Sequence, residues 1–412
     1  MSFIKSVSKK ADTFSSPLLI LFAFSFPLST SAGSVTAILV ALAWILSGDY
    51  KEKFREIGRN PVAIAVLCYI ALNALGLLWT DDMYWGMKTL KKQWKLLLFP
   101  VFLTLVRKEH INYYLYAFIA AIFLSACKAY LVWLGFITLP PGSIFTTEGT
   151  SHVIYNPMLA LAIYILLQKL IFSRNSPLQT GVLIFLVFFL SCNMFITVGR
   201  TGQIVFFILL IVLLFQTFYK KSKTKLLLGL LLLPLLIAAI FQFSPTFRGR
   251  INLALTEIRE MKSQAYTSVG CRVWFLQNSC KLLEGHRLLG IGTGDFPNEY
   301  AKINQLYSPK MPVTNNPHNQ YLLTATQFGL TGLFLLLTIF GGQFLYGRKQ
   351  KDNLTPLRMA FPIFFMVIML AESYLVVHAT GLLFSLFSAI LYKDLRQQDD
   401  TSQDIQNKPK SR

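Results

Sequence analysis

Long apolar segments recur along almost the whole chain, and this feature restricts the fold more than any other. A helix needs about 20 apolar residues to cross a hydrocarbon core about 30 Å thick. Because a backbone in lipid must satisfy its hydrogen bonds internally, segments of this kind cross a membrane as helices. Hydrophobic residues make up 54% of the 412 residues, against roughly 45–50% in soluble domains. We therefore expect an all-α integral membrane protein.

The apolar segments predict about 12 transmembrane helices, with both termini on the same side of the membrane. The predicted spans lie near residues 16–31, 33–47, 61–79, 95–106, 111–134, 152–172, 178–198, 201–219, 226–243, 320–346, 358–373 and 375–392. Residues 1–31 also have features of a secretory signal, because small residues stand near a candidate cleavage point. Apolar sequence resumes at once, which favours an uncleaved first hairpin.

The charge distribution predicts the orientation. The net charge is +20, and lysine and arginine gather in the short loops on the side of the N-terminus. Examples are Lys51, Arg107, Arg174, Lys220 and Arg348. Such a bias marks the cytoplasmic side. The positive charge therefore requires no nucleic-acid partner.

The one long hydrophilic insertion divides the chain into parts. We expect an N-terminal transmembrane bundle over 1–243, a large external loop with short helices over 244–319, and C-terminal transmembrane helices over 320–392. Residues 393–412 are expected to form a disordered cytoplasmic tail. The external loop carries more basic than acidic residues, which suggests an anionic ligand.

Two patterns stand out inside the external loop. Residues 271–283 have apolar positions at helical spacing, and Gly285 is a suitable helix stop. A glycine-rich stretch follows, with glycines at 290, 292 and 294. A nucleotide-binding glycine loop needs a strand before it and a helix after it, and we expect neither here. We interpret the stretch as a tight turn that covers the site.

A second external segment, residues 80–95, predicts an amphipathic helix. Residues Thr80 to Asp82 supply an N-cap. One face carries four lysines at helical spacing, Lys88, Lys91, Lys92 and Lys95. The segment fits an interfacial helix that holds anionic lipid headgroups. It equally fits a lysine stripe that meets a diphosphate.

Arg200 stands between two apolar segments, where a charge is costly. Arginines at this depth are candidates for function, and a guanidinium offers a fixed fork of donors for phosphate oxygens. Flanking glycines, Gly199 and Gly202, favour the functional interpretation, because they let a bulky ligand approach the backbone. The alternative is an arginine that reaches up to the headgroups.

His318 lies where the external loop meets the next apolar segment, in the sequence Asn316-Pro317-His318-Asn319. A histidine side chain ordinarily changes charge near pH 6.5, so it is suited to general-base catalysis. Pro317 restricts the chain before it, and Asn319 could orient the ring or a sugar. The alternative is a histidine that caps the following helix.

Other residues have weaker support from the sequence. Lys128 and Glu372 are a candidate ion pair, and His152 could line the same cavity as His318. No cysteine spacing resembles a metal site, and no Asp-x-Asp or phosphate-binding loop is present. We therefore expect neither a metal nor a cofactor.

Taken in order along the chain, these elements resemble the O-antigen ligase family. The resemblance rests on the many spans, the large late loop, and three motifs: Val198-Gly199-Arg200-Thr201-Gly202, Cys271-Arg272-Val273-Trp274 and Pro317-His318-Asn319. The glycine-rich turn adds to it. This family shares a domain with O-antigen polymerases and bacterial protein O-oligosaccharyltransferases. Many relatives have Ser-Arg-Gly around Arg200, so only the arginine is carried over.

The resemblance implies an inverting, metal-independent glycosyltransferase of the bacterial inner membrane. A glycan would pass from an undecaprenyl diphosphate-linked donor to a lipid A-core hydroxyl on the periplasmic side. Arg200 and Arg272 would hold the diphosphate and His318 would activate the acceptor. Further substrate contacts are expected from Lys88, Lys91, Lys92, Asn156, Asn316, Asn319, Gly292 and Gly294.

Three alternatives remain at this point. An O-antigen polymerase or a protein O-oligosaccharyltransferase of the same family would differ in the acceptor. A multi-span lipid or sugar transporter would show internal repeats and a polar midplane with broken helices. We find no convincing repeat, and the polar residues concentrate outside the spans.

Overall fold

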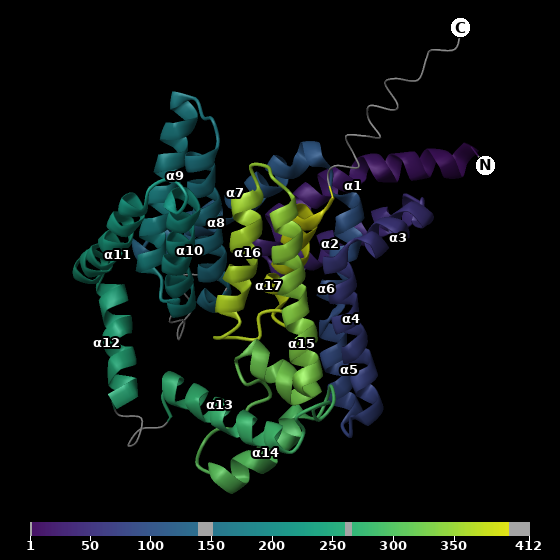
Figure 1. Cartoon of the computed structure of the whole chain (residues 1–412), viewed down its shortest axis with the longest axis vertical. Coiled ribbons are helices and arrows are strands. Elements are labelled where there is room, and N and C mark those ends of the chain that lie inside the picture. The colour runs from purple at the N-terminus through teal and green to yellow at the C-terminus, as the bar shows by residue number, and fades with distance from the viewer. Residues whose placement is uncertain (1, 139–150, 260–265, 395–412) are drawn as a thin grey trace.

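The computed structural model describes residues 2–138, 151–259 and 266–394, and in these residues the protein is built from helices (Figure 1). The helices are α1 (Ser2–Leu28), α2 (Thr30–Leu46), α3 (Tyr50–Arg59), α4 (Pro61–Leu75), η1 (Gly76–Trp79), α5 (Met83–Lys92), α6 (Trp94–Leu105), η2 (Lys108–His110), α7 (Ile111–Trp133), α8 (His152–Phe172), α9 (Pro177–Ile196), α10 (Arg200–Phe218), α11 (Lys223–Phe243), α12 (Pro245–Arg259), α13 (Ser268–Glu284), α14 (Phe296–Tyr307), α15 (Gln320–Lys349), α16 (Thr355–Ile368) and α17 (His378–Tyr392). The predicted all-α class is confirmed, and the protein is a multi-pass membrane protein.

Each predicted span coincides with a helix, but the predicted number of spans is not confirmed. Within the described residues, eight helices are long and apolar enough to cross a membrane, or nine if α2 and α3 form one broken span bent by 115°. The other predicted spans correspond to α6, α16 and α17, which have 12, 14 and 15 residues. These three helices are shorter than a full membrane span, and the non-helical or short helical segments next to them line the site described below.

Local sequence signals fix where several helices begin. Asn60 accepts hydrogen bonds from the amides of Val62 and Ala63 at 3.1 and 3.0 Å, with Pro61 in the first turn of α4. Ser176 and Gln179 cap each other's backbone amides at the start of α9, again before a proline. Both arrangements satisfy donors that a helix start leaves without partners.

The core lies where α8 and α17 pass through the bundle. All residues of α17 from Ala379 to Tyr392 are buried, and aromatic rings fill the space around it. The Phe361 and Phe387 rings are stacked with centroids 5.7 Å apart. Arg358 is fully buried, yet its Nε donates to the Leu391 carbonyl at 2.6 Å and its guanidinium forms an ion pair with Asp352. A buried charge is tolerated here because it is paired.

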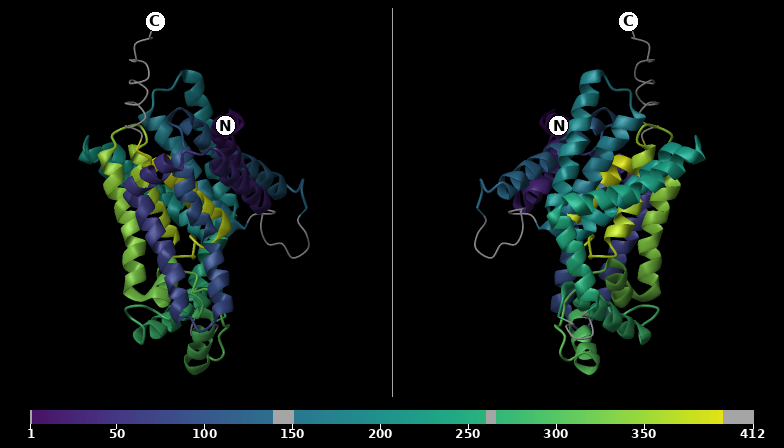
Figure 2. Two further views of the ribbon diagram at one scale, coloured as in Figure 1. Left: turned by 90° about the vertical axis from the view of Figure 1, so that its right-hand side faces the viewer. Right: turned by 90° about the vertical axis from the view of Figure 1, so that its left-hand side faces the viewer.

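The segment predicted as an external loop forms helices α12, α13 and α14. Helix α13 contains the predicted helix 271–283 and ends before Gly285. The expectation that no helix follows the glycine-rich turn is wrong, because α14 begins at Phe296. In all three ribbon views, α13 and α14 lie beyond one end of the long helices (Figures 1 and 2). A small second core, with Phe275, Phe296 and Tyr300, holds them together.

Helix α15 is interrupted near the site. Gly329 has φ +61°, a conformation that favours glycine. At this break the amides of Ile291 and Gly292 donate to the carbonyls of Thr326 and Gln327 at 2.9 and 3.0 Å. The Leu330 amide in turn donates to the Arg287 carbonyl at 2.8 Å. The glycine-rich turn thus replaces hydrogen bonds that the helix loses.

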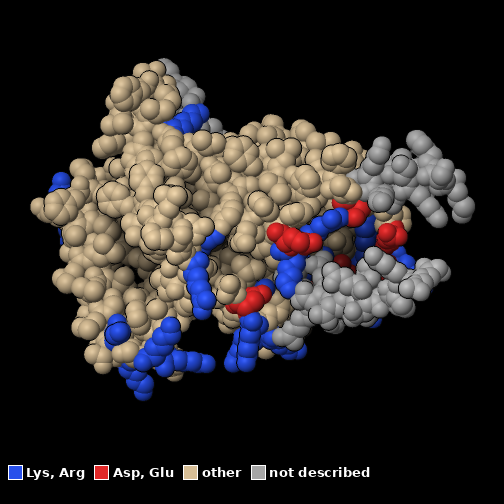
Figure 3. Space-filling view, turned by 90° about the horizontal axis from the view of Figure 1, so that it is seen from above, with Lys and Arg blue, Asp and Glu red and all other residues tan. Residues whose placement is uncertain are grey.

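Basic side chains gather at the end of the molecule opposite α13 and α14 (Figure 3). Exposed members of this group include Lys108, Arg174, Lys220 and Arg348, which stand at or near helix ends. Their common location agrees with the loops that the charge distribution assigns to the cytoplasm. The orientation in the membrane stays a prediction.

Candidate active site

His318 lies in the segment between α14 and α15, with φ +51°. Left-handed backbone is uncommon for residues other than glycine, and histidine is among the more tolerant types. Next to it, Asn319 caps α15: its Oδ1 accepts from the amides of Tyr321 and Leu322 at 2.9 and 3.1 Å. Its Nδ2 donates to the Leu370 carbonyl at 3.2 Å. The protein therefore engages both polar atoms of Asn319, and a substrate contact by this residue stays an untested prediction.

A carboxylate holds the His318 ring. Glu372, from the non-helical segment between α16 and α17, places Oε2 2.6 Å from Nδ1 of His318. Its other oxygen, Oε1, accepts from Nδ2 of Asn316 at 2.9 Å and from the Ser373 amide at 2.8 Å. Asn316 also accepts from the His318 amide and from the Ser373 hydroxyl, at 3.1 and 2.7 Å. Asn316 thus fixes the loop and the carboxylate together.

This network determines which ring nitrogen carries the proton when the imidazole is neutral. Burial raises the pKa of Glu372. Hydrogen bonding and charge from His318, together with hydrogen bonds from Ser373 and Asn316, lower the pKa by more than burial raises it, so it lies below the ordinary value. Glu372 is therefore an ionised acceptor, and Nδ1 of His318 must be the donor in this contact. In a neutral imidazole that leaves Nε2 as the basic nitrogen.

His318 lines a cavity of about 330 Å³ between α5, the glycine-rich turn and the loop before α15. The Phe275 ring of α13 stacks on the imidazole, with centroids 5.8 Å apart and an angle of 26° between the planes. Asn316 lines the same cavity. The ring plane is thus fixed by Phe275 on one side and by Glu372 at its edge.

Two lysines of the predicted stripe face this cavity. Lys88 and Lys92 line it, whereas Lys91 is not among the lining residues. The ammonium of Lys88 lies 4.0 Å from the Trp85 ring centroid. Burial lowers the pKa of Lys92, and the charge of Lys88 lowers it further. Two cations that line one cavity favour an anionic ligand.

The start of the lysine helix is also as predicted from the sequence. Asp82 accepts a hydrogen bond from the Trp85 amide at 3.0 Å and so caps α5. Lys95, the last lysine of the stripe, lies in α6, where its ammonium donates to the Val376 carbonyl at 2.6 Å. The four lysines therefore divide between two helices, and Lys95 supports the wall of the cavity through Val376.

The glycines of the turn pack against the neighbouring helices. A Cβ atom on Gly292 would lie 2.5 Å from the Thr80 hydroxyl, and one on Gly294 would lie 2.4 Å from the Asp82 carbonyl oxygen. Asp295 accepts from the amides of Asp81 and Asp82 at 2.9 and 2.7 Å. The turn is thus fixed to α5, and Thr293 is the turn residue that lines the cavity. Direct contact of Gly292 and Gly294 with substrate stays an untested prediction.

A cluster of arginines lies at the starts of α10, α12 and α13. Arg200 forms an ion pair with Glu257 at 3.1 Å, while its Nε and Nη2 and the Nε of Arg250 are buried without partners among the described residues. Burial lowers the pKa of Arg250, and the charges of Arg200 and Arg272 lower it further, although Glu257 opposes this. Unsatisfied buried donors are costly, and anionic oxygens would satisfy them.

An apolar cavity of about 300 Å³ begins at this cluster. Arg200 and Arg250 line it together with apolar side chains from α10, α11 and α12, among them Phe207, Ile237 and Leu255. Two cations at one end of an apolar space match an amphiphile with an anionic head. Sequence reasoning identified Arg200 but missed Arg250 and Glu257, which no motif singles out.

Asn156 has a structural role. It is fully buried, and its Nδ2 donates to the Thr197 hydroxyl at 2.7 Å. A Cβ atom on Gly199 or Gly202 would lie 2.4 or 2.3 Å from atoms of Asn156. The glycines beside Arg200 therefore make room for Asn156, and the expectation that they let a ligand approach the backbone stays a prediction. Contact of Asn156 with substrate stays an untested prediction.

Tyr374 joins the two parts of the site. Its hydroxyl donates to the Val153 carbonyl at the start of α8, at 2.7 Å. Burial raises the pKa of Tyr374 and the charge of Glu372 raises it further, whereas a hydrogen bond with Thr201 and the charge of Arg272 act in the opposite direction. Tyr374 thus lies between Glu372, the arginine cluster and the helix start next to Arg200.

The structure gives Glu372 partners that the sequence did not indicate. The suggested pair was Lys128, but the Glu372 oxygens contact His318, Asn316 and the Ser373 amide. A carboxylate at the end of an apolar segment was the available signal. Within the described residues, no three His, Cys, Asp or Glu side chains gather as ligands of a metal would.

Part of the chain matches a known protein family. Residues 185–337 match the family model described as O-antigen ligase. The match confirms the predicted O-antigen ligase family, and it covers Arg200, Arg272 and His318. A search of curated proteins finds no match. Members of this family are glycosyltransferase-like enzymes, and the family implies lipid-linked glycans as substrates.

Proposed function

We propose that the protein transfers a glycan from undecaprenyl diphosphate to a hydroxyl of lipid A-core at the periplasmic face of the inner membrane. The observation that carries this proposal is the contact between Glu372 and His318 at 2.6 Å. It leaves Nε2 as the basic nitrogen of a ring that lines a cavity with two lysines. A base beside cations suits a reaction in which a hydroxyl is deprotonated and an anion departs.

In the proposed step, Nε2 of His318 takes the proton of the acceptor hydroxyl as its oxygen attacks the anomeric carbon. The bond from that carbon to the diphosphate oxygen breaks, and its electron pair leaves with the diphosphate. A single displacement of this kind inverts the anomeric centre. Glu372 stabilises the imidazolium that forms, as a buried carboxylate partner can.

Arg200 and Arg272 are assigned to the charge that develops on the departing diphosphate, and Arg250 is added to them. The support is the set of buried guanidinium nitrogens of Arg200 and Arg250 without partners in the described part of the chain, together with the Arg272 charge that acts on Arg250. The apolar cavity beside Arg200 and Arg250 suits the first part of a prenyl chain. Lys88 and Lys92 are assigned to anionic groups of donor or acceptor in the His318 cavity.

Transfer by purified protein in lipid vesicles tests the proposal. Wild type should join a glycan from an undecaprenyl diphosphate donor to lipid A-core, and His318→Asn should not. Parallel reactions with a second donor molecule or with a protein as acceptor would reveal a polymerase or a protein O-oligosaccharyltransferase. Failure of all three acceptors with a folded, donor-binding protein would contradict the assignment of glycan transfer to this site.

A further inference from the structure

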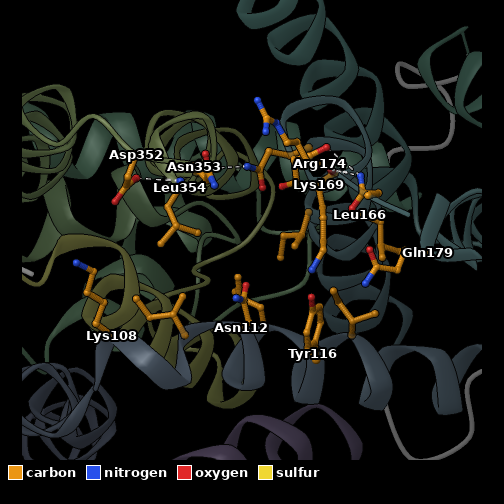
Figure 4. A pocket seen from close by; sticks show the side chains of 17 residues that line it. Lys108, Asn112, Tyr116, Leu166, Lys169, Arg174, Gln179, Asp352, Asn353 and Leu354 are labelled. Atoms are coloured by element: carbon orange, nitrogen blue, oxygen red, sulfur yellow. Dashed lines mark hydrogen bonds between the residues drawn. The ribbon is translucent and has the colours of Figure 1, made fainter. Parts of the chain in front are cut away.

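Two adjoining cavities occupy the end of the molecule opposite His318. The first, of about 470 Å³, lies between the start of α7, the end of α8 and the loop between α15 and α16 (Figure 4). Polar side chains line much of it, including Asn112, Gln179 and Asn353. In Figure 4, Asn112 and Tyr116 rise from α7 toward Lys169 of α8.

The second cavity, of about 500 Å³, is apolar and lies between α7 and α9. Its walls include Phe123, Val182 and Leu186. The two cavities adjoin, because both are lined by Tyr116, Ile119, Leu166, Lys169 and Gln179. A polar chamber therefore lies next to an apolar groove between the helices.

The polar chamber carries a net positive charge. Lys108, Lys169 and Arg174 line it, and among the described lining residues Asp352 is the only carboxylate. Asp352 forms an ion pair with Arg358, whose side chain has no exposed surface. Its charge is thus already neutralised from within the protein, and the three cations dominate the chamber.

Lys169 stands at the junction of the two cavities. Its ammonium lies 4.2 Å from the centroid of the Tyr116 ring, which also lines both cavities. An anionic group beside Lys169 would therefore have apolar walls directly below it. Basic pockets between transmembrane helices on the cytoplasmic side are a known way to bind anionic headgroups.

The groove is closed beyond its apolar part. The Phe123 and Phe189 rings lie 5.2 Å apart, and the Tyr130 hydroxyl donates to the Phe189 carbonyl at 2.8 Å. These contacts join α7 to α9 beyond the apolar groove.

We propose that this space binds one anionic glycerophospholipid, with its phosphate beside Lys169 and Arg174 and an acyl chain in the groove between α7 and α9. Charge selects the class of lipid. A zwitterionic headgroup would bring an ammonium group next to three cations, and the one carboxylate in the described lining is already paired. The apolar groove selects a lipid over a free phosphate, which could not fill it.

The site is independent of the proposed transfer reaction, because it lies at the opposite end of the helices from His318. Its occupant would connect α7 and α8 to the loop before α16. Native mass spectrometry of detergent-purified protein with added phosphatidylglycerol or phosphatidylcholine tests the proposal. Wild type should retain phosphatidylglycerol in preference to phosphatidylcholine.

The decisive variant is Lys169→Gln combined with Arg174→Gln. Retention of phosphatidylglycerol should fall by about fivefold for each cation removed. The matched control is Lys220→Gln, an exposed lysine at the same end that does not line either cavity; it should behave as wild type. Equal retention by the double variant, or equal retention of both lipids by wild type, would overturn the proposal.

A second variant keeps the test valid if the double variant fails to fold. Val182→Trp fills the apolar groove and leaves every cation in place. It should reduce retention of phosphatidylglycerol, because the acyl chain loses its space. Wild-type retention by a folded Val182→Trp protein would also overturn the proposal.

Discussion

Oε2 of Glu372 lies 2.6 Å from Nδ1 of His318, and this contact joins the loop before α15 to the non-helical segment between α16 and α17. The two residues come from parts of the chain 54 positions apart. Neither loop alone would hold an imidazole in a defined orientation. The position of the proposed base therefore depends on the tertiary fold, which brings the two loops together.

Replacing His318 tests the base directly. His318→Asn is preferable to alanine, because asparagine tolerates the left-handed backbone found at this position. Loss of a general base should lower turnover by about 10²–10⁴, while donor binding remains. Turnover and donor binding should be measured on the same purified protein. His286→Asn, which changes an exposed histidine outside the cavity, is the control. A His318→Asn protein with wild-type turnover would remove His318 from the chemistry.

Replacing Arg272 tests the assignment of diphosphate binding. Loss of one preorganised charge contact should cost about 3 kcal/mol, or 10²–10³ in rate. Arg272→Lys should recover little, because one ammonium cannot replace a bidentate fork. Arg200→Ala is a less clean test, since it leaves the buried Glu257 carboxylate without its ion-pair partner. Transfer rates should be compared with those of Arg259→Ala, an exposed arginine of α12. Full activity of a folded Arg272→Ala protein would refute the assignment.

Glu372 should make stability depend on pH. Its pKa in the folded protein lies below the ordinary value of 4.5. The stabilisation is therefore fully present above pH 4.5 and is lost as the pH falls through the lowered pKa. Glu372→Gln should be less stable than wild type near neutral pH, by about 1–3 kcal/mol. The difference should shrink in acid. Thermal melts of both proteins across this pH range measure the difference in stability. A stability difference that does not change with pH would contradict the prediction.

The close packing of Asn156 predicts a strong effect at a small residue. Gly202→Ala would place a Cβ atom 2.3 Å from Asn156, so the start of α10 must shift. We expect a loss of about 1–3 kcal/mol, seen as a lower melting temperature and yield. Gly181→Ala in α9 is the matched control, because nothing lies within 4 Å of its new Cβ atom. Equal melting temperatures for the two variants would show that Asn156 does not confine this helix.

Cysteine labelling tests the orientation. A cysteine at Lys310, which is exposed near α14, should react with a membrane-impermeant reagent in intact spheroplasts, whereas one at Lys220 should react only after lysis. A protein without its native cysteines is the background for both. Ser308 is unsuitable because it is buried against Asn278. The reverse pattern would place His318 on the cytoplasmic side.

Much of the bundle could be predicted because apolar length and caps are local signals. The sequence located every long helix and also α5, whose cap at Asp82 is visible in the sequence. It failed where an element's boundary depends on distant contacts. Helix α16 ends at Ile368 so that the following residues can reach His318 and Asn316, and no local pattern contains that information.

The site also divides into residues that local sequence signals reveal and residues whose roles depend on distant contacts. Arg200 and His318 are unusual for their surroundings, so the sequence draws attention to them. The sequence predicts that Asn156 and the glycines beside Arg200 lie near a ligand, because small and polar residues often do. Only the packed structure shows that these residues contact each other. The sequence identifies Glu372 as a charged residue near an apolar segment, but the tertiary fold determines its partner.

The break at Gly329 has a mechanical consequence. The first part of α15, which begins directly after His318 and Asn319, is bonded to the 287–292 segment as well as to the rest of its own helix. A displacement of the glycine-rich turn would therefore be transmitted to His318 through the nine residues Gln320–Phe328. This short segment could move while the long remainder of α15 stays in place in the membrane.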